Sequence, residues 1–328
     1  MRKMISKIMA LGSSQLAIPR GTHDGFSHLQ GVPDELAIEI DANGSPITVS
    51  EASWFICFVP GLQKQWWHRF TNAKHKHVFA MRMVGENTWI LVEPWWTRMM
   101  VNVLTLDEAV KFLRWGSIGH ILKVQEHIPG KGSQARGWSN CAVLMSFLLG
   151  RSYWTWTPHG LYRRLRTELT TTCVDLPQFL SEHLEWVANK TAEQTLSAPL
   201  QTDFDSLEDA LLSIGYGIAT ASISPTANGL YKVAVSESRR FRNASEKYWK
   251  FGPEKAVEVV QEQLDFARQR QEIQLENCAT TASQFVAMLR GDLQLKTLFA
   301  VQPPPNNREI QLHVRAAVTT LLNGVSIT

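Results

Sequence analysis

The hydrophobic pattern of the chain changes its period near Pro177. Before this point, short apolar runs with strand character alternate with turn signals. After it, seven segments carry apolar residues at spacings of three and four, which is the spacing of one helix face. The chain has 328 residues, enough for two domains that each bury a core. The pattern therefore predicts an α+β N-terminal module with a small antiparallel sheet, followed by an all-α helical bundle.

Composition changes at the same place. Residues 1–176 hold 19 of the 33 Lys and Arg and 13 of the 30 Asp and Glu, a net charge of +6, which leaves 14 and 17, or −3, for residues 177–328. Ten of the 12 Trp and eight of the 10 His also precede residue 177. We therefore interpret residues 1–52 as a loose arm, 53–176 as the α+β module and 177–328 as the all-α domain.

The net charge and the cysteine positions limit which partners and which cellular compartment we expect. The total net charge of +3 is too small to indicate nucleic acid or an anionic membrane as a partner. Cys57, Cys141, Cys173 and Cys278 lie far apart without a CxxC pair, which favours a reducing, cytoplasmic location. No stretch approaches 18 uncharged apolar residues, and Lys7 interrupts the N-terminal apolar run, so we expect no membrane span and no signal peptide.

Local signals place the main elements. Strands are predicted at 54–59, 77–84 and 88–92, the last two joined as a hairpin by the turn signal at 85–87. Helices are predicted at 106–115 and 140–149, and then at 179–195, 207–221, 225–238, 244–251, 254–271, 280–290 and 309–322. Pro225 and Pro253 are each expected at a first helical position, where the missing N–H costs nothing.

One cysteine is a candidate nucleophile. Ser139 and Asn140 are capping-type residues directly before an apolar helix, so Cys141 is expected in its first turn. There, the unpaired N–H groups and the helix dipole stabilise a thiolate. His77 opens one strand of the hairpin and Glu93 closes the next, so the two are expected to meet at one sheet edge as base and orienting acid.

The order of these residues resembles a known hydrolase layout. A histidine on a strand, an acid on the next strand and a late cysteine opening a helix is similar to the circularly permuted papain-like, NlpC-type cysteine hydrolases, and more narrowly to small phage and prophage proteins. The segments are 77–80 (HVFA), 89–94 (WILVEP), 140–143 (NCAV) and 157–165 (TPHGLYRRL), within about 53–166. The resemblance implies a permuted papain-like fold and hydrolysis of cell-wall peptide or another amide by Cys141, His77 and Glu93.

Other interpretations of this module stay open. Cys141 can be a small buried hydrophobe. His75 competes with His77 for the base role, since alternation in a strand puts both imidazoles on one face; the pair can also be two metal ligands, although no third ligand has a diagnostic spacing. The loop 130–133 lacks the order of a phosphate-binding loop. The pairs Trp66–Trp67 and Trp95–Trp96 can pack the sheet or stack bases, glycans or peptide.

The second part resembles a regulatory domain. The segments 206–212 (SLEDALL), 230–241 (LYKVAVSESRRF), 251–256 (FGPEKA), 282–295 (ASQFVAMLRGDLQL) and 313–318 (HVRAAV), within about 179–328, are similar to the C-terminal domain of TetR/AcrR-type transcriptional repressors. In that family, the domain encloses a small-molecule pocket and dimerises through its last long helices. Those helices are 280–290 and 309–322 in this sequence.

Two function classes follow. The chain is expected either to be a dimeric, ligand-binding regulator or to be a cysteine amidase or peptidase whose helical part only dimerises it. No pair of short helices joined by a glycine turn precedes the regulatory segment, so direct DNA binding is not expected. The partners predicted are a second copy of the chain and a small-molecule effector, with no cofactor.

Overall fold

The structure is a computed structural model that describes residues 50–61, 71–95, 98–128, 140–153, 155–200 and 204–325. Several interpretations lie outside the described residues: residues 1–49 of the arm interpreted at 1–52, the loop at 130–133, Trp66, Trp67 and Trp96, and Ser139 before the predicted helix at 140–149. Within them, the sheet-containing part and the helical part are both present, in the predicted order.

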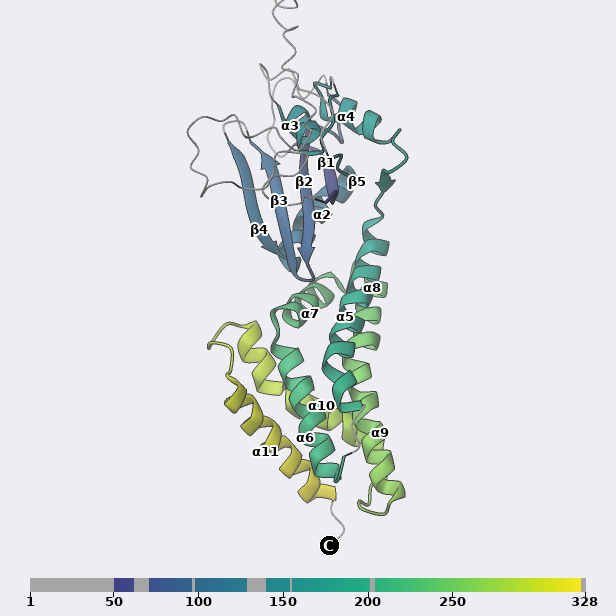
Figure 1. Ribbon diagram of the computed structural model, residues 1–328, viewed down its shortest axis with the longest axis vertical. Coiled ribbons are helices and arrows are strands. Elements are labelled where there is room, and N and C mark those ends of the chain that lie inside the picture. Colours follow the sequence, from purple (N-terminus) through teal and green to yellow (C-terminus); the bar gives the residue numbers. More distant parts are fainter. Residues whose placement is uncertain are drawn as a thin grey trace, which may run out of the picture.

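A six-stranded antiparallel sheet has the strand order β4-β3-β2-β1-β5-β6 (Figure 1). The strands are β1 (Ser53–Val59), β2 (His77–Gly85), β3 (Thr88–Pro94), β4 (Met99–Thr105), β5 (His120–Gln125) and β6 (Thr172–Cys173). The predicted hairpin is confirmed as β2–β3, with Gly85 opposite Thr88. Strands β4 to β6 were not predicted; β4 is a largely exposed edge strand without the alternation that marks a half-buried one.

Helices cover both faces of the sheet. On one face, Phe79 and Met81 pack with α2 (Leu106–Ile118) and the first half of α5 (Leu176–Leu200). On the other, Val78 and Ala80 pack with α3 (Cys141–Leu148) and α4 (Pro158–Leu165). Because the central strands are buried on both faces, β1 consists of one continuous apolar run.

The helical part contains every predicted helix. After α5 come α6 (Leu207–Ile223), α7 (Pro225–Glu237), α8 (Arg242–Trp249), the π-helical turn η3 (Lys250–Glu254), α9 (Lys255–Gln269), α10 (Cys278–Leu298) and α11 (Asn307–Val325). Pro225 begins α7 behind the Ser224 cap, as predicted. The prediction for Pro253 is wrong, because it lies inside η3 between α8 and α9. A π turn accommodates the missing N–H within a continuing helix.

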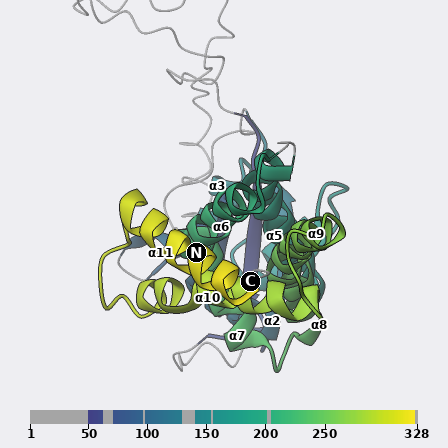
Figure 2. The ribbon, with the colours of Figure 1, turned by 90° about the horizontal axis from the view of Figure 1, so that it is seen from below.

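The last two helices bury their apolar stripes within the chain. Helices α6, α9, α10 and α11 share one hydrophobic core, and Figure 2 shows α10 and α11 on the opposite side of the helical part from α8 and α9. Dimerisation through these helices would leave some of their apolar residues facing outward, but the following are all buried in that core: Phe285, Val286, Leu289, Ile310, Val314, Ala317, Val318 and Leu321. Helices α10 and α11 each carry apolar residues on more than one side because each packs against more than one neighbouring helix.

The sheet and the helices are joined by a shared core. The sheet face that packs on α2 also contacts Leu180 and Leu184 of α5 and Leu230 and Val233 of α7. At the β2–β3 turn, Asn87 donates through Nδ2 to the Pro225 carbonyl (3.0 Å) and accepts from the Leu106 N–H (3.1 Å). Figure 1 shows α7 directly below this turn. Helix α5, which begins at Leu176, contributes to this core and, through Ala192, to the core of the helical part.

Among the helices described, none is long and apolar enough to span a lipid bilayer.

Candidate functional site

The hairpin brings His77 and Glu93 together at one end of the sheet. His77 is the first residue of β2, opposite Val59, and Glu93 is next to last in the antiparallel β3. Nε2 of His77 lies 3.4 Å from Oε1 of Glu93. The histidine side chain is 21% exposed and the carboxylate 6%, so the pair can meet a substrate through the imidazole.

Cys141 reaches the same place from α3. Asn140 caps this helix by accepting from the Val143 N–H (3.1 Å), and its side-chain amide donates to the Trp156 carbonyl (2.8 Å), which fixes the start of the helix. Cys141 is the first helical residue, is half-buried, and forms a side-chain hydrogen bond with His77. The three residues singled out in the sequence thus lie together.

The surroundings favour a charged imidazole. Burial alone lowers the pKa of His77, but hydrogen bonds and charge interactions with Cys141 and Glu93 more than offset it and raise the pKa to about 9. A positive imidazolium beside a thiol is the arrangement that activates a cysteine nucleophile.

Trp115 is a part of this site that sequence reasoning missed. Its indole stacks on the imidazole of His77, with ring centroids 6.2 Å apart and an interplanar angle of 29°, and on Phe79 at 5.3 Å. Its Nε1 donates to the Pro60 carbonyl at 3.3 Å. The indole therefore holds the imidazole plane from the α2 side. Its position at the end of a predicted helix gave no hint of this contact.

The other cysteines have different surroundings. Cys57 is fully buried in β1 and Cys278 is buried at the start of α10, and in both burial raises the pKa of the thiol. Cys173 is exposed on the edge strand β6. Of these four thiols, Cys141 is the one beside an imidazole and a carboxylate.

The expectation that His75 and His77 share a face is wrong. Strand β2 begins at His77, so His75 precedes the alternating region and is 2% exposed on the α4 side. Its Nδ1 lies 2.9 Å from Nδ1 of His159, and its Nε2 lies 2.7 Å from Nδ1 of His120. Tyr162 packs against the ring at 4.3 Å. His75 is therefore the middle of a three-histidine cluster and no competitor for the base role.

The environment favours the neutral forms of His75 and His120 in this cluster. Burial, then the neighbouring His120, His159 and Lys74, lower the pKa of His75 to about 4. Burial also lowers the pKa of His120. The two ring nitrogens of His75 point to different partners, so the three rings do not converge on one point. In the described ranges, no group of three or more His, Cys, Asp or Glu side chains is arranged to hold a metal ion, and the pairing of His75 with His77 as metal ligands is wrong.

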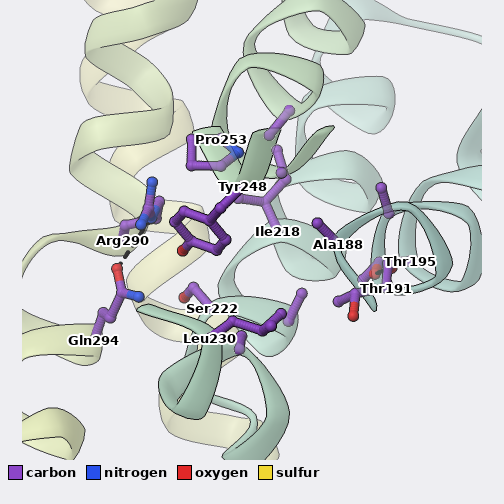
Figure 3. Close-up of a pocket in the computed structure, with 15 residues that line it drawn as sticks. Ala188, Thr191, Thr195, Ile218, Ser222, Leu230, Tyr248, Pro253, Arg290 and Gln294 are labelled. Atoms are coloured by element: carbon purple, nitrogen blue, oxygen red, sulfur yellow. Dashed lines mark hydrogen bonds between the residues drawn. The ribbon is translucent and has the colours of Figure 1, made fainter. Parts of the chain in front are cut away.

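A second candidate site is a pocket inside the helical part. It has a volume of about 90 Å³ and is lined by α5 to α10 (Figure 3). Most of the wall is apolar or small, with Ala188, Ile218, Ala227, Leu230 and Pro253 among the lining residues. On the scale where one water occupies 10–15 Å³, this space holds roughly six to nine waters, the size of a small organic molecule.

The charged residue of the pocket and two of its polar residues lie on one side. Figure 3 shows Arg290, Gln294 and Tyr248 near one another, with Thr191 and Thr195 across the pocket. Arg290 lies immediately before the kink of α10 at Gly291, and its Nε donates to Oε1 of Gln294 at 3.0 Å across that kink. Tyr248 lies beside Arg290, whose positive charge acts on the phenol. The sequence did not mark any of these residues.

Comparison with known proteins identifies the helical part. Residues 209–324 match the AefR-like transcriptional repressor, C-terminal domain. This segment is a TetR-type C-terminal domain. It contains α7 to α10 and most of α6 and α11, so five of the helices around the pocket belong wholly or partly to the TetR-type region. Curated proteins provide no match to this chain.

Three solved structures are similar to part of the chain. A protein assigned to the TetR-family transcriptional regulators of Mesorhizobium loti has 14% identity and a TM-score of 0.42 over 57% of this chain and 87% of its own. The flavonoid-responsive regulator FrrA has 16% identity and a TM-score of 0.41 over the same shares. A Rhodococcus protein assigned to the same family has 13% identity and a TM-score of 0.36 over 55% and 87%.

Proposed function

We propose that this chain is a ligand-responsive regulator whose TetR-type helical part binds a small molecule in the α5–α10 pocket and dimerises. The observation that carries the proposal is the pocket itself, because its floor and walls are built largely from the segment that matches a repressor C-terminal domain. A concave, mostly apolar site with a few polar groups on one side is the usual form of a small-molecule site.

Ligand binding is tested by filling the pocket. Ala221 lines it, and Ala221→Phe places a ring in the space that a ligand occupies. A set of small alcohols, amines and carboxylic acids with six to eight carbons is screened by thermal shift, since a ligand that binds only the folded state raises Tm with its concentration. We expect one or more to stabilise the wild type but not Ala221→Phe, while Ser236→Phe, at an exposed position of α7, keeps the response. If no compound distinguishes the wild type from Ala221→Phe, the sensor function is refuted.

Dimerisation is proposed to use the outer faces of α10 and α11. Their inner stripes are occupied within the chain, but Gln284 and Ala287 of α10 and Leu312, Ala316 and Thr319 of α11 are exposed and uncharged at helical spacings. The small side chains among them, Ala287, Ala316 and Thr319, allow close approach of helices from a second copy. A two-fold interface of this kind would make the same patch face itself.

We do not expect direct recognition of duplex DNA. The described part ahead of α5 is built around the antiparallel sheet. Regulation in this proposal acts through the sheet-containing part or through a mixed assembly with another regulator. Specific DNA binding by this chain alone, surviving physiological salt in a footprinting experiment, would contradict this part of the proposal.

A second candidate function is amide or peptide hydrolysis by Cys141. It is favoured by the placement of the His77 imidazole between a thiol and a buried carboxylate. The sulfur would attack the carbonyl carbon, the C–N bond would break, and the imidazolium would give its proton to the leaving amine. Water would then hydrolyse the thioester, with neutral His77 taking its proton and the thiolate leaving. Glu93 would orient the ring and stabilise its charged form.

The reactivity of Cys141 tests this candidate. Iodoacetamide labelling at pH 7 is followed for Cys141 and for the exposed Cys173 by mass spectrometry of peptides. We expect Cys141 to react at least about tenfold faster, and His77→Gln to remove the advantage while His75→Gln retains it. Release of amine from peptide amides, including cell-wall peptides, must then disappear in Cys141→Ser. Equal labelling of Cys141 and Cys173 would show a structural thiol.

A further inference from the structure

We infer that the pocket in the helical part selects a small anionic ligand, a carboxylate with an apolar body, through Arg290, Tyr248 and Gln294. This inference rests on the proposed ligand-binding function and names the chemical class of the ligand. It starts from the charge of Arg290. Among the described residues, no carboxylate forms an ion pair with this guanidinium; it donates to the neutral Gln294, and the neutral Tyr248 lies beside it.

The three polar side chains together present donors. Nε of Arg290 donates its hydrogen to the side-chain carbonyl oxygen of Gln294. The two N–H donors of the Gln294 amide are therefore not used in this hydrogen bond and can donate to a ligand. Tyr248, on the same side of the pocket, adds a hydroxyl donor. Burial raises the pKa of Tyr248, so the phenol keeps its proton at neutral pH. A cation flanked by two neutral donors is a site for an anionic oxygen.

The rest of the pocket offers a ligand little to hydrogen-bond. Ser222 donates to the Ala219 carbonyl and Thr191 to the Val187 carbonyl, both at 2.8 Å, and Thr195 donates to the Thr191 carbonyl. These hydroxyl donors are therefore satisfied within their own helices. The remaining wall is mainly aliphatic, which suits a hydrocarbon or aromatic body. The volume of about 90 Å³ limits this body to a short chain or one ring.

The burial of these polar side chains suits an anionic ligand. Gln294 is buried and Arg290 half-buried, so a carboxylate placed there would be largely withdrawn from water. An anion in that position is stabilised by a full charge as well as by neutral donors, and the isosteric neutral compound is not. The pocket should therefore discriminate by charge at one end and by shape at the other.

Matched ligand pairs test the inference on the full chain. Hexanoate is compared with hexan-1-ol and benzoate with benzyl alcohol by isothermal titration calorimetry at constant ionic strength. We expect each carboxylate to bind about tenfold or more tightly than its alcohol. Arg290→Gln should weaken the carboxylate at least about tenfold and leave the alcohol within about twofold, and Tyr248→Phe should have a smaller effect in the same direction. Arg268→Gln, on the exposed side of α9, should change neither.

The outcomes separate the ligand class from the sensor function. If alcohols bind as tightly as carboxylates and are lost in Ala221→Phe, the pocket is a ligand site but the anionic class is wrong. If carboxylate binding survives both Ala221→Phe and Arg290→Gln, the anion binds elsewhere and the inference is wrong. If no compound responds to Ala221→Phe, the sensor function itself fails, and the inference with it. The wild-type comparison of acid with alcohol decides the class even where a variant does not fold.

Discussion

Nη1 of Arg114 lies 2.9 Å from Oε1 of Glu237, and this ion pair links α2, beneath the sheet, to α7 of the helical part. Glu237 is 5% exposed and its second oxygen has no partner in the described structure. The neighbour of Arg114 in the chain, Trp115, stacks on His77, and α7 lines the pocket with Ala227 and Leu230. The pair therefore joins the helix that carries Trp115 to a helix that lines the pocket.

Removing only the arginine should destabilise the fold. Arg114→Met leaves a buried carboxylate without its cation, and we expect a loss of about 2 kcal/mol in the free energy of unfolding, less than for a fully buried pair because Arg114 is partly exposed. Arg114→Met combined with Glu237→Leu should recover most of this loss. Urea denaturation measures both. The exposed pair Arg242–Glu246 is the control, and Arg242→Met should cost under about 0.5 kcal/mol. Equal losses of unfolding free energy in Arg114→Met and Arg242→Met would contradict the role of Arg114 as the partner of a buried carboxylate.

The pKa of His77 should depend on Cys141. Its value of about 9 is raised by the thiol and by Glu93 against the effect of burial. In Cys141→Ala we expect the pKa to fall by more than one unit, measured by NMR titration of the imidazole. The folded-state pKa lies above the unfolded value near 6.5, so the linked stability is full below pH 6.5 and is lost as pH rises toward 9. Cys173→Ala should leave the titration unchanged, and a wild-type pKa below 7 would contradict the thiol–imidazole pair.

The histidine cluster should weaken the fold in acid. The folded-state pKa of His75, about 4, is below its unfolded value, so the unfolded chain binds more protons between pH 6.5 and 4. The free energy of unfolding should fall across this window as pH decreases, by at most about 1.4 kcal/mol per pH unit from this one group. His75→Gln should flatten the decline between pH 6.5 and 5, where few carboxylates titrate. His127→Gln, outside the cluster, should retain it; an unchanged slope in His75→Gln would be inconsistent with the low pKa.

The oligomeric state should respond to the outer face of α11. Leu312→Glu combined with Ala316→Arg places charges on exposed positions, and we expect a folded monomer by size-exclusion chromatography with light scattering. Gln178→Arg, an exposed position on α5, should remain dimeric. Val314→Glu should instead unfold the chain, because Val314 is 1% exposed within the helical core. A wild-type chain already monomeric at tens of micromolar would refute the dimer.

Short-range sequence signals predicted most of the secondary structure. The β2–β3 hairpin and all seven helices after residue 177 followed from turn residues, caps and apolar spacing, each of which acts over a few residues. The meeting of His77 with Glu93 is of this kind too, because a hairpin with a short turn places the start of one strand beside the end of the next. Pro253 shows the limit, since its effect depended on whether the helix continued beyond it.

The sequence by itself determined strands β1 to β3, helices α2 and α3, the helices after residue 177 and several of their caps, because these follow from local backbone sterics and hydrogen bonding. Only the tertiary structure decided where side chains from distant segments meet. His75 turned from the expected strand face to His120 and His159, 45 and 84 residues away, and Arg290 and Tyr248 came together at a pocket lined by α5 to α10. Such contacts depend on how helices and sheet pack, and packing is set by the burial of apolar area over the whole chain, which no local pattern encodes.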